Sequence, residues 1–168
     1  MKTRSFFAAA LALAFCACAG DAPPADEAET AAAGDTVAAA APSVIDEFTP
    51  VDTTQMQHTA SGLFMQDVRE GTGAPLVAGQ TAVVHYTGWF PDGTKFDSSR
   101  DRGEPFEVVQ VGQAPVILAW NEGLLGMKVG GVRKLLVAPE LGYSIGGMPP
   151  VIPPNATLVF LIELLQIK

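Results

Sequence analysis

Residues 83–102 read VVHYTGWFPDGTKFDSSRDR, and their pattern predicts two short strands joined by a tight turn. In the first strand, which begins slightly earlier, Ala82, Val84 and Tyr86 fall on one face. His85 falls on the opposite face, where we expect a structural role for it. This alternation is typical of a strand that buries one side against a core.

The turn of this hairpin lies at residues 91–93, Pro-Asp-Gly. Proline fixes φ and glycine takes positive φ at little cost, so the chain reverses sharply there. Phe96 and Asp97 follow at once, and the reversal brings them close to Tyr86. Two aromatic rings beside a carboxylate are compatible with simple core packing, or with a pocket that has apolar walls and a few polar points.

Alternating or apolar runs predict further strands along the rest of the chain. The predicted strands cover residues 61–68, 80–88, 95–97, 105–109, 133–137 and 156–166. Residues 116–125 change period, because Val116, Trp120 and Leu124 recur at helical spacing. A sheet with an apolar face needs a cover, and this helix is the candidate for it. The sequence therefore predicts an α+β fold, a twisted antiparallel β-sheet wrapped as a half-barrel around one short α-helix.

The hairpin resembles, almost residue for residue, the signature of the FKBP-type peptidyl-prolyl cis-trans isomerases, the macrolide-binding immunophilins. The resemblance continues through Val116-Ile117, Trp120, Tyr143 and residues 152–160, which read IPPNATLVF. It covers residues 54–168 in register. It implies an FKBP-like half-barrel that catalyses rotation about X-Pro peptide bonds in an aromatic pocket, with no cofactor and no metal. The implied partners are proline-containing polypeptides and macrolide immunosuppressant-type ligands.

The resemblance also implies roles for individual positions. The implied catalytic positions are Tyr86, Asp97, Tyr143 and Phe96, and the implied substrate-binding positions are Trp120, Val116, Ile117, Phe106, Phe160 and Ile152. Trp120 is expected at the pocket floor, beneath the proline ring. The backbone N–H of Ile117 and the hydroxyl of Tyr143 are expected to donate to substrate carbonyl groups.

Several positions differ from the usual family pattern. Ser144-Ile145 follow Tyr143 where glycine is usual, Pro115 lacks a backbone donor, and Leu118-Ala119 replace a more usual Arg-Gly. We expect these changes to alter the residue preferred before proline and the affinity for macrolides, and to leave the activity in place.

The composition supports few other kinds of chemistry. Residues 54–168 contain His58 and His85 and no cysteine, so we expect neither a metal site nor a disulfide there. No nucleophile elbow, phosphate loop or dinucleotide fingerprint occurs. Most of the net charge of −8 belongs to residues 1–53, which hold 8 acidic and 2 basic residues. No basic surface for nucleic acid is therefore expected.

Residues 1–18, MKTRSFFAAALALAFCAC, read as a lipoprotein-like signal peptide. Its apolar run is too short for a membrane span, which needs about 20 residues. We favour Cys18 as the lipidated residue, with Cys16 as an alternative and an ordinary cleaved signal as another. Alanine, and not aspartate, follows each cysteine, so retention in the inner membrane is not expected. The predicted location is the bacterial cell envelope, facing the periplasm and lipid-anchored in the outer membrane.

Residues 19–53 are predicted to form a flexible Ala/Pro/acidic tether, since residues 19–47 contain too little apolar surface to fold. Residues 44–57 read as a transition to the folded domain. No heptad of large residues supports a dimerising coiled coil, and we expect a monomer. Residues 54–168 then form the isomerase domain.

The leading hypothesis for the function is a lipid-anchored prolyl isomerase that assists the folding of envelope proteins. A binding module that holds proline-containing segments without catalysis is an alternative, which the altered loop at residues 144–150 favours. A protein whose tether carries the function is a third. Turnover of a short X-Pro peptide separates the first two, and deletion of residues 54–168 tests the third.

Overall fold

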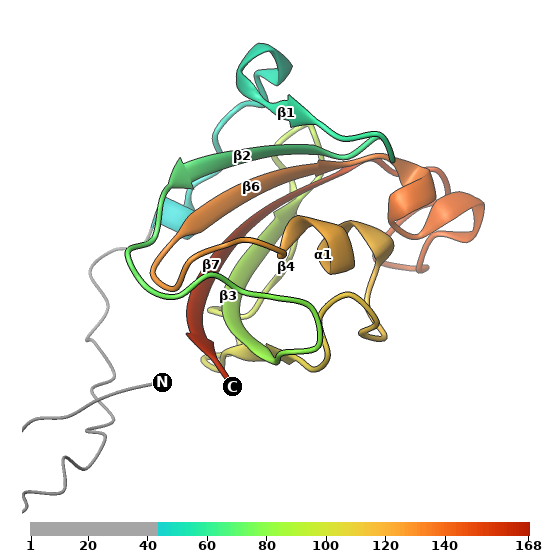
Figure 1. Cartoon of the computed structure of the whole chain (residues 1–168). Helices are drawn as coiled ribbons and strands as arrows, with labels where there is room; N and C mark the ends of the chain where they lie inside the picture. The colour runs from blue at the N-terminus through green and yellow to red at the C-terminus, as the bar shows by residue number, and fades with distance from the viewer. Residues whose placement is uncertain (1–43) are drawn as a thin grey trace, which may run out of the picture. The chain divides into compact units, whose positions relative to one another are not determined.

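The computed structural model of the protein describes residues 44–168 (Figure 1). The signal peptide predicted at residues 1–18 and most of the predicted tether lie outside the described residues. In chain order the elements are η1 (Val44–Asp46), η2 (Thr53–Gln55), β1 (Gln57–His58), β2 (Phe64–Arg69), β3 (Ala82–Trp89), β4 (Lys95–Ser98), β5 (Phe106–Val108), α1 (Leu118–Gly123), β6 (Val132–Val137), η3 (Pro139–Leu141), η4 (Ser144–Gly146) and β7 (Leu158–Ile167).

The strands form one antiparallel sheet in the order β1-β2-β6-β7-β3-β4, and β5 also pairs with β3. One edge of β3 pairs with β7 along its whole length. The other edge pairs with β5 at residues 82–84 and with β4 at residues 87–89. Among the described strands, β1 and β4 end the sheet and do not pair with each other, so the sheet stays open. This is the α+β half-barrel predicted from the sequence, with α1 against its inner face (Figure 1).

The inner face of the sheet carries the main core. Ala82, Val84 and Tyr86 of β3 belong to it, as their alternation predicts. Phe160 and Ile162 of β7 continue the same core on the neighbouring strand. Burial of apolar side chains by both long central strands supplies the main driving force for this fold.

The helix α1 is shorter than predicted, with six residues in place of residues 116–125. A helix of this length has little stability of its own. The guanidinium of Arg133, on β6, donates to the carbonyls of Gly123 at 2.9 Å and Leu125 at 3.0 Å, and pairs with Asp67 at 2.6 Å. Carbonyl groups at a helix C-terminus lack partners within the helix and favour a cation, so Arg133 holds α1 to the sheet.

Residues 45–50 pack on the outer face of the sheet, opposite α1, and we call them the strap. Ile45 is fully buried against Trp89, and Phe48 packs on the same cluster. The start of this segment (η1, cyan in Figure 1) lies behind the sheet. The prediction that the flexible tether extends over residues 19–53 is therefore wrong at its C-terminal end. Two large apolar residues among acidic ones anchor the segment, because the outer face of the sheet offers an apolar patch for them.

His85 lies on the outer face of β3, with its Nδ1 atom 3.0 Å from the Ser99 hydroxyl. Burial, and after it the positive charge of Arg100, lowers the pKa of His85 below its usual value of about 6.5. The negative charge of Glu163, which pairs with Arg100 at 2.6 Å, opposes this effect. The folded protein therefore holds His85 in its neutral form more strongly than the unfolded chain does.

Because of His85, the fold should lose stability on mild acidification. The unfolded chain protonates this residue near pH 6.5 and the folded chain at lower pH, so the free energy of unfolding falls as the pH drops from 7 through the lowered pKa. In urea denaturation between pH 7 and pH 5, we expect His85→Asn, which does not titrate, to show a smaller fall. Equal falls in both proteins would contradict this explanation.

Candidate functional site

One pocket on the inner side of the sheet gathers most of the predicted site residues. Its volume is about 450 Å³. It is lined by Tyr86, Phe96, Asp97, Phe106, Pro115, Val116, Ile117, Trp120, Tyr143, Met148, Val151 and Phe160. Within this lining, the carboxylate of Asp97 is the single charged group. Such a composition suits an apolar ligand that is oriented by a few polar contacts.

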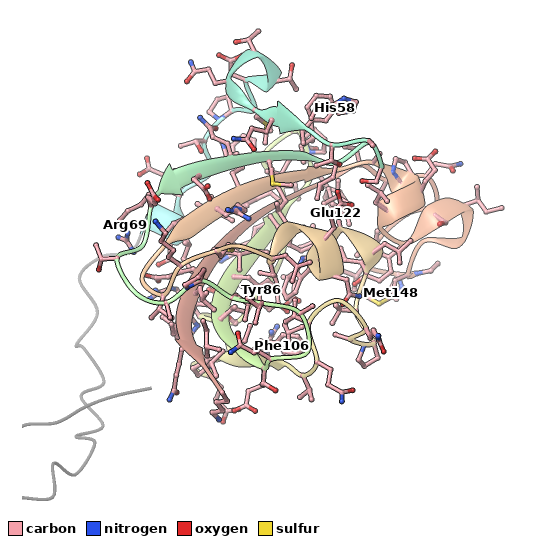
Figure 2. All side chains as sticks on the ribbon, viewed as in Figure 1. His58, Arg69, Tyr86, Phe106, Glu122 and Met148 are labelled. Carbon is pink, nitrogen blue, oxygen red and sulfur yellow. The ribbon has the colours of Figure 1, made fainter. Side chains whose placement is uncertain are left out.

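Trp120 forms the centre of an aromatic cluster at the base of the pocket. Its ring meets those of Tyr86, Phe106 and Phe160 edge to face, at centroid distances of 4.9, 5.9 and 5.5 Å. The ring quadrupoles favour this arrangement, so each ring restrains the orientation of the others. Tyr86 and Phe106 lie together on the α1 side of the sheet (Figure 2). The cluster therefore presents a rigid apolar floor.

A β-bulge explains why the neighbours Phe96 and Asp97 both face the pocket. In a regular strand, successive side chains point to opposite faces. Gly88 pairs with Asp97 but Trp89 pairs with Lys95, so Phe96 is an extra residue in β4. A bulge of this kind re-aims side chains. Gly88 leaves room for the arrangement, because a Cβ atom there would lie 2.6 Å from the Phe96 ring.

Asp97, Tyr86 and Arg102 form a closed hydrogen-bonded group in the pocket wall. The Tyr86 hydroxyl donates to one carboxylate oxygen of Asp97 at 2.5 Å, and the Arg102 guanidinium pairs with the other. Arg102 also donates to the Tyr86 hydroxyl at 2.7 Å, and its guanidinium carbon lies 5.4 Å from the centre of that ring.

The surroundings of Tyr86 keep it neutral. Burial, and after it the bond to Asp97, raises the pKa of Tyr86 to about 12. Both oxygens of the carboxylate are engaged at the same time. An efficient general acid or base has a pKa near the working pH and a free position toward its substrate. The group is therefore built to hold its geometry, and is poorly suited to moving a proton.

The side chain of Asn121 shapes the loop that leads to Ile117. Its Oδ1 atom accepts from the N–H groups of Gly112 and Ala114, both at 2.9 Å, and its Nδ2 atom donates to the Ala114 carbonyl at 2.9 Å. Ile117 caps α1 with an extended backbone, and its carbonyl accepts from the N–H of Trp120. The N–H of Ile117 itself has no partner among residues 44–168, which leaves it free for a ligand.

Tyr143 stands at the side of the pocket formed by the loop before β7. Burial, and after it the negative charge of Asp97, raises the pKa of Tyr143. Its hydroxyl has no hydrogen-bond partner in the described part of the chain. Met148 and Val151 in the same loop line the pocket and are 45% and 46% exposed. A neutral hydroxyl and an apolar rim are thus available to an occupant of the pocket.

The structure brings nine of the ten predicted site residues into the lining, and Ile152 is the exception. Its side chain is 1% exposed in the main core, and its backbone bonds twice with Met148. Ile152 therefore supports the loop from the core, while its neighbour Val151 lines the pocket, and a role of Ile152 in substrate binding stays a prediction. The predicted lipidation residues Cys16 and Cys18 lie outside the described residues.

Four residues that contribute to the site were given no site role from the sequence. They are Arg102, Pro115, Met148 and Val151. The signal for Arg102 was the charged run at residues 100–102, but charged runs near a turn are usually solvated surface. Pro115 and Met148 lie in loops, where periodicity does not indicate which side chains point inward.

Neither histidine of the domain joins the pocket. The ring of His58 stacks on Phe64 at 4.4 Å near the edge of the sheet, and His85 contacts Ser99 on the outer face. Figure 2 shows His58 far from Tyr86 and Phe106. Among residues 44–168, no three His, Cys, Asp or Glu side chains gather as ligands for a metal ion.

Comparison with known proteins gives consistent matches. A family model described as FKBP-type peptidyl-prolyl cis-trans isomerase matches residues 73–165. The chain is 50% identical over 106 residues to the FK506-binding protein of Neisseria meningitidis serogroup B, a match that covers 63% of this chain and 96% of that protein. It is 49% identical over 108 residues to FK506-binding protein 1A of Emericella nidulans, covering 64% of this chain and 99% of that protein.

Two solved structures resemble the fold. The crystal structure of FkpA from Escherichia coli matches with a TM-score of 0.62 and 43% sequence identity, over 68% of this chain and 52% of that chain. The crystal structure of AtFKBP13 matches with a TM-score of 0.62 and 35% identity, over 67% of this chain and 98% of that chain.

The environment of the pocket predicts an unusual alkaline titration. Tyr86 and Tyr143 are the two tyrosines of the chain, and both have raised pKa values, so native protein at pH 10 should show little tyrosinate absorbance. Unfolded protein should be about half ionised at that pH. In Tyr143→Phe, the remaining signal should titrate near pH 12. Half ionisation of the native protein at pH 10 would contradict the burial of these hydroxyls.

Proposed function

Since this chain belongs to the family of FKBP-type peptidyl-prolyl cis-trans isomerases, we propose that it rotates X-Pro peptide bonds in the pocket above Trp120. The chain is an isomerase of this class, and the family binds proline-containing substrates and macrolide ligands. We place the reaction in this pocket because aromatic rings from separate segments of the chain converge on its volume of about 450 Å³.

Rotation about the X-Pro bond is accelerated by moving the amide from water into an apolar environment, and it needs no reactive side chain. Amide resonance sets the barrier to rotation at about 18–20 kcal/mol. The twisted amide has lost this conjugation and is less polar along the C–N bond. An apolar pocket therefore favours it over the planar, hydrated ground state. A rate increase of about 10⁶ requires the barrier to fall by about 8 kcal/mol.

The polar groups of the pocket serve to orient the substrate. In this proposal, the proline ring lies on Trp120, the N–H of Ile117 donates to one substrate carbonyl, and the Tyr143 hydroxyl donates to another. These contacts hold the chain on either side of the X-Pro bond, so rotation is confined to that bond. The hydrogen-bonded group around Asp97 keeps the wall in place and transfers no proton.

We also propose a location and a biological role. The signal-like sequence of residues 1–18 supports a lipid on Cys18, with the domain facing the periplasm from the outer membrane as a monomer. Proline-containing envelope proteins are then the substrates, and assistance to their folding is the role. Within residues 44–168, no helix combines the length and apolarity of a membrane span.

The full-length protein should accelerate isomerisation of a short X-Pro peptide in a protease-coupled assay, and FK506 should suppress the rate. Tyr143→Phe should lower kcat/KM about two- to tenfold, because it removes one hydrogen bond worth about 0.5–1.5 kcal/mol. Total loss of activity in this variant, if it is folded, would mean that the hydroxyl has a chemical role. A wild-type rate equal to background would contradict the proposed reaction.

Lipid attachment should depend on Cys18. In a bacterial host fed a labelled fatty acid, Cys18→Ser should lose the label and leave the membrane fraction, because the modified side chain is gone. Cys16→Ser, which removes the neighbouring cysteine, is the matched control and should keep the label. The opposite result would assign the lipid to Cys16, and wild-type protein without label would contradict the anchor.

A further inference from the structure

The strap lies directly behind the part of the sheet that forms one wall of the pocket. The ring of Phe48 packs at 6.0 Å from that of Trp89 on the outer face. Trp89 follows Gly88, the residue that stands opposite the bulge in β4. That bulge aims Phe96 and Asp97 into the pocket on the inner face. One side of the hairpin therefore faces the pocket, and the other rests on Phe48.

Phe48 also supports the turn between β3 and β4. Gly93 in this turn has a φ of +89°, and a Cβ atom there would lie 3.2 Å from the Phe48 ring. The turn is closed by two bonds, from the N–H of Gly93 to the Phe90 carbonyl at 2.9 Å and from the N–H of Phe90 to the Thr94 carbonyl at 2.8 Å. Phe48 thus contacts both the end of the strand and the turn that follows it.

The strap is itself held firmly on both sides of Phe48. Ile45 is fully buried before it. After it, the ammonium of Lys134 donates to the backbone carbonyls of Thr49 at 2.9 Å and Pro50 at 3.2 Å. Lys134 is 5% exposed, and burial lowers its pKa. A buried lysine with these partners is a specific contact, because its ammonium would otherwise lack hydrogen bonds.

The β4 side of the hairpin has few other contacts that would keep it in place, so packing on Phe48 matters for it. β4 has four residues and ends the sheet, so it pairs with β3 alone among the described strands. Short edge elements with few neighbours open most readily. The Phe90 ring lies 5.1 Å from that of Phe96, so the turn is in direct contact with a residue of the pocket.

We propose that the strap is a positioning element of the isomerase, in which Phe48 holds the bulged hairpin so that Phe96 and Asp97 keep their places in the pocket. The inference rests on the proposed function of that pocket. The strap precedes residues 73–165, which match the family model, so the match itself does not account for it. Phe48 is not part of the pocket lining, and it acts through Trp89 and Gly93.

The test compares two phenylalanines in the full-length protein. Phe48→Ala removes the ring that packs on Trp89 and Gly93. Phe64→Ala removes a half-buried ring from β2, which lies away from the hairpin across the sheet. At a temperature where both variants are folded, Phe48→Ala should lower kcat/KM for an X-Pro peptide about tenfold, since small misplacements in a site are costly. Phe64→Ala should leave kcat/KM unchanged. Phe48→Leu should restore most of the activity.

Hydrogen exchange and ligand affinity provide readouts that do not depend on turnover. In Phe48→Ala, the amides of Phe90 and Gly93 should exchange faster while those of β6 and β7 stay protected, and FK506 should bind more weakly. Equal acceleration at all amides, or kcat/KM and FK506 affinity equal to those of Phe64→Ala, would overturn the proposal. Phe48→Val is measured in parallel, so a milder variant is available if Phe48→Ala does not fold.

Failure of the proposed function has a different signature. A wild-type protein without turnover would count against the reaction alone. The exchange pattern and the FK506 affinity of Phe48→Ala would then still decide whether the strap positions the pocket wall.

Discussion

The packing of the Trp120 ring against the inner face of the sheet is the contact on which both the core and the pocket depend. Trp120 is 4% exposed within the main core, and it also forms the pocket floor. Helix α1, which carries Trp120, has six residues and little stability of its own. Burial of the Trp120 ring and the hydrogen bonds from Arg133 to the carbonyls at the helix end hold α1 in place. The Nε1 atom of Trp120 is buried without a hydrogen-bond partner among the described residues, which lowers the stability of the fold at this position.

The hairpin of β3 and β4 is the second feature that joins fold and site. A bulge directs two successive side chains inward, and Gly88 leaves the space that they occupy. The outward side of the same hairpin is covered by the strap through Trp89. The pocket wall is therefore a thin layer with packing on both faces.

The polar side chains in the pocket wall hydrogen-bond to one another and hold the wall in place. Asp97, Tyr86 and Arg102 satisfy one another, and the raised pKa of Tyr86 keeps the phenol neutral at ordinary pH. What remains available to a ligand is apolar surface, the N–H of Ile117 and the Tyr143 hydroxyl. These are the groups that the proposed rotation about an X-Pro bond uses, since the reaction transfers no group and no proton.

The sequence by itself determined the half-barrel and the inner face of β3 through periodicity within single elements, and the family through its motif. The resemblance to that family implied ten pocket residues, nine of which line the pocket. Tertiary structure alone decided how these residues are turned into the pocket and which loop residues join them. Alternation assigns Phe96 and Asp97 to opposite faces until a bulge against Gly88 overrides it. Whether Val151 or Ile152 faces the pocket depends on how the loop closes. The strap was assigned to a tether because its composition resembles one, and only the apolar patch around Trp89, assembled from distant strands, makes its folding favourable.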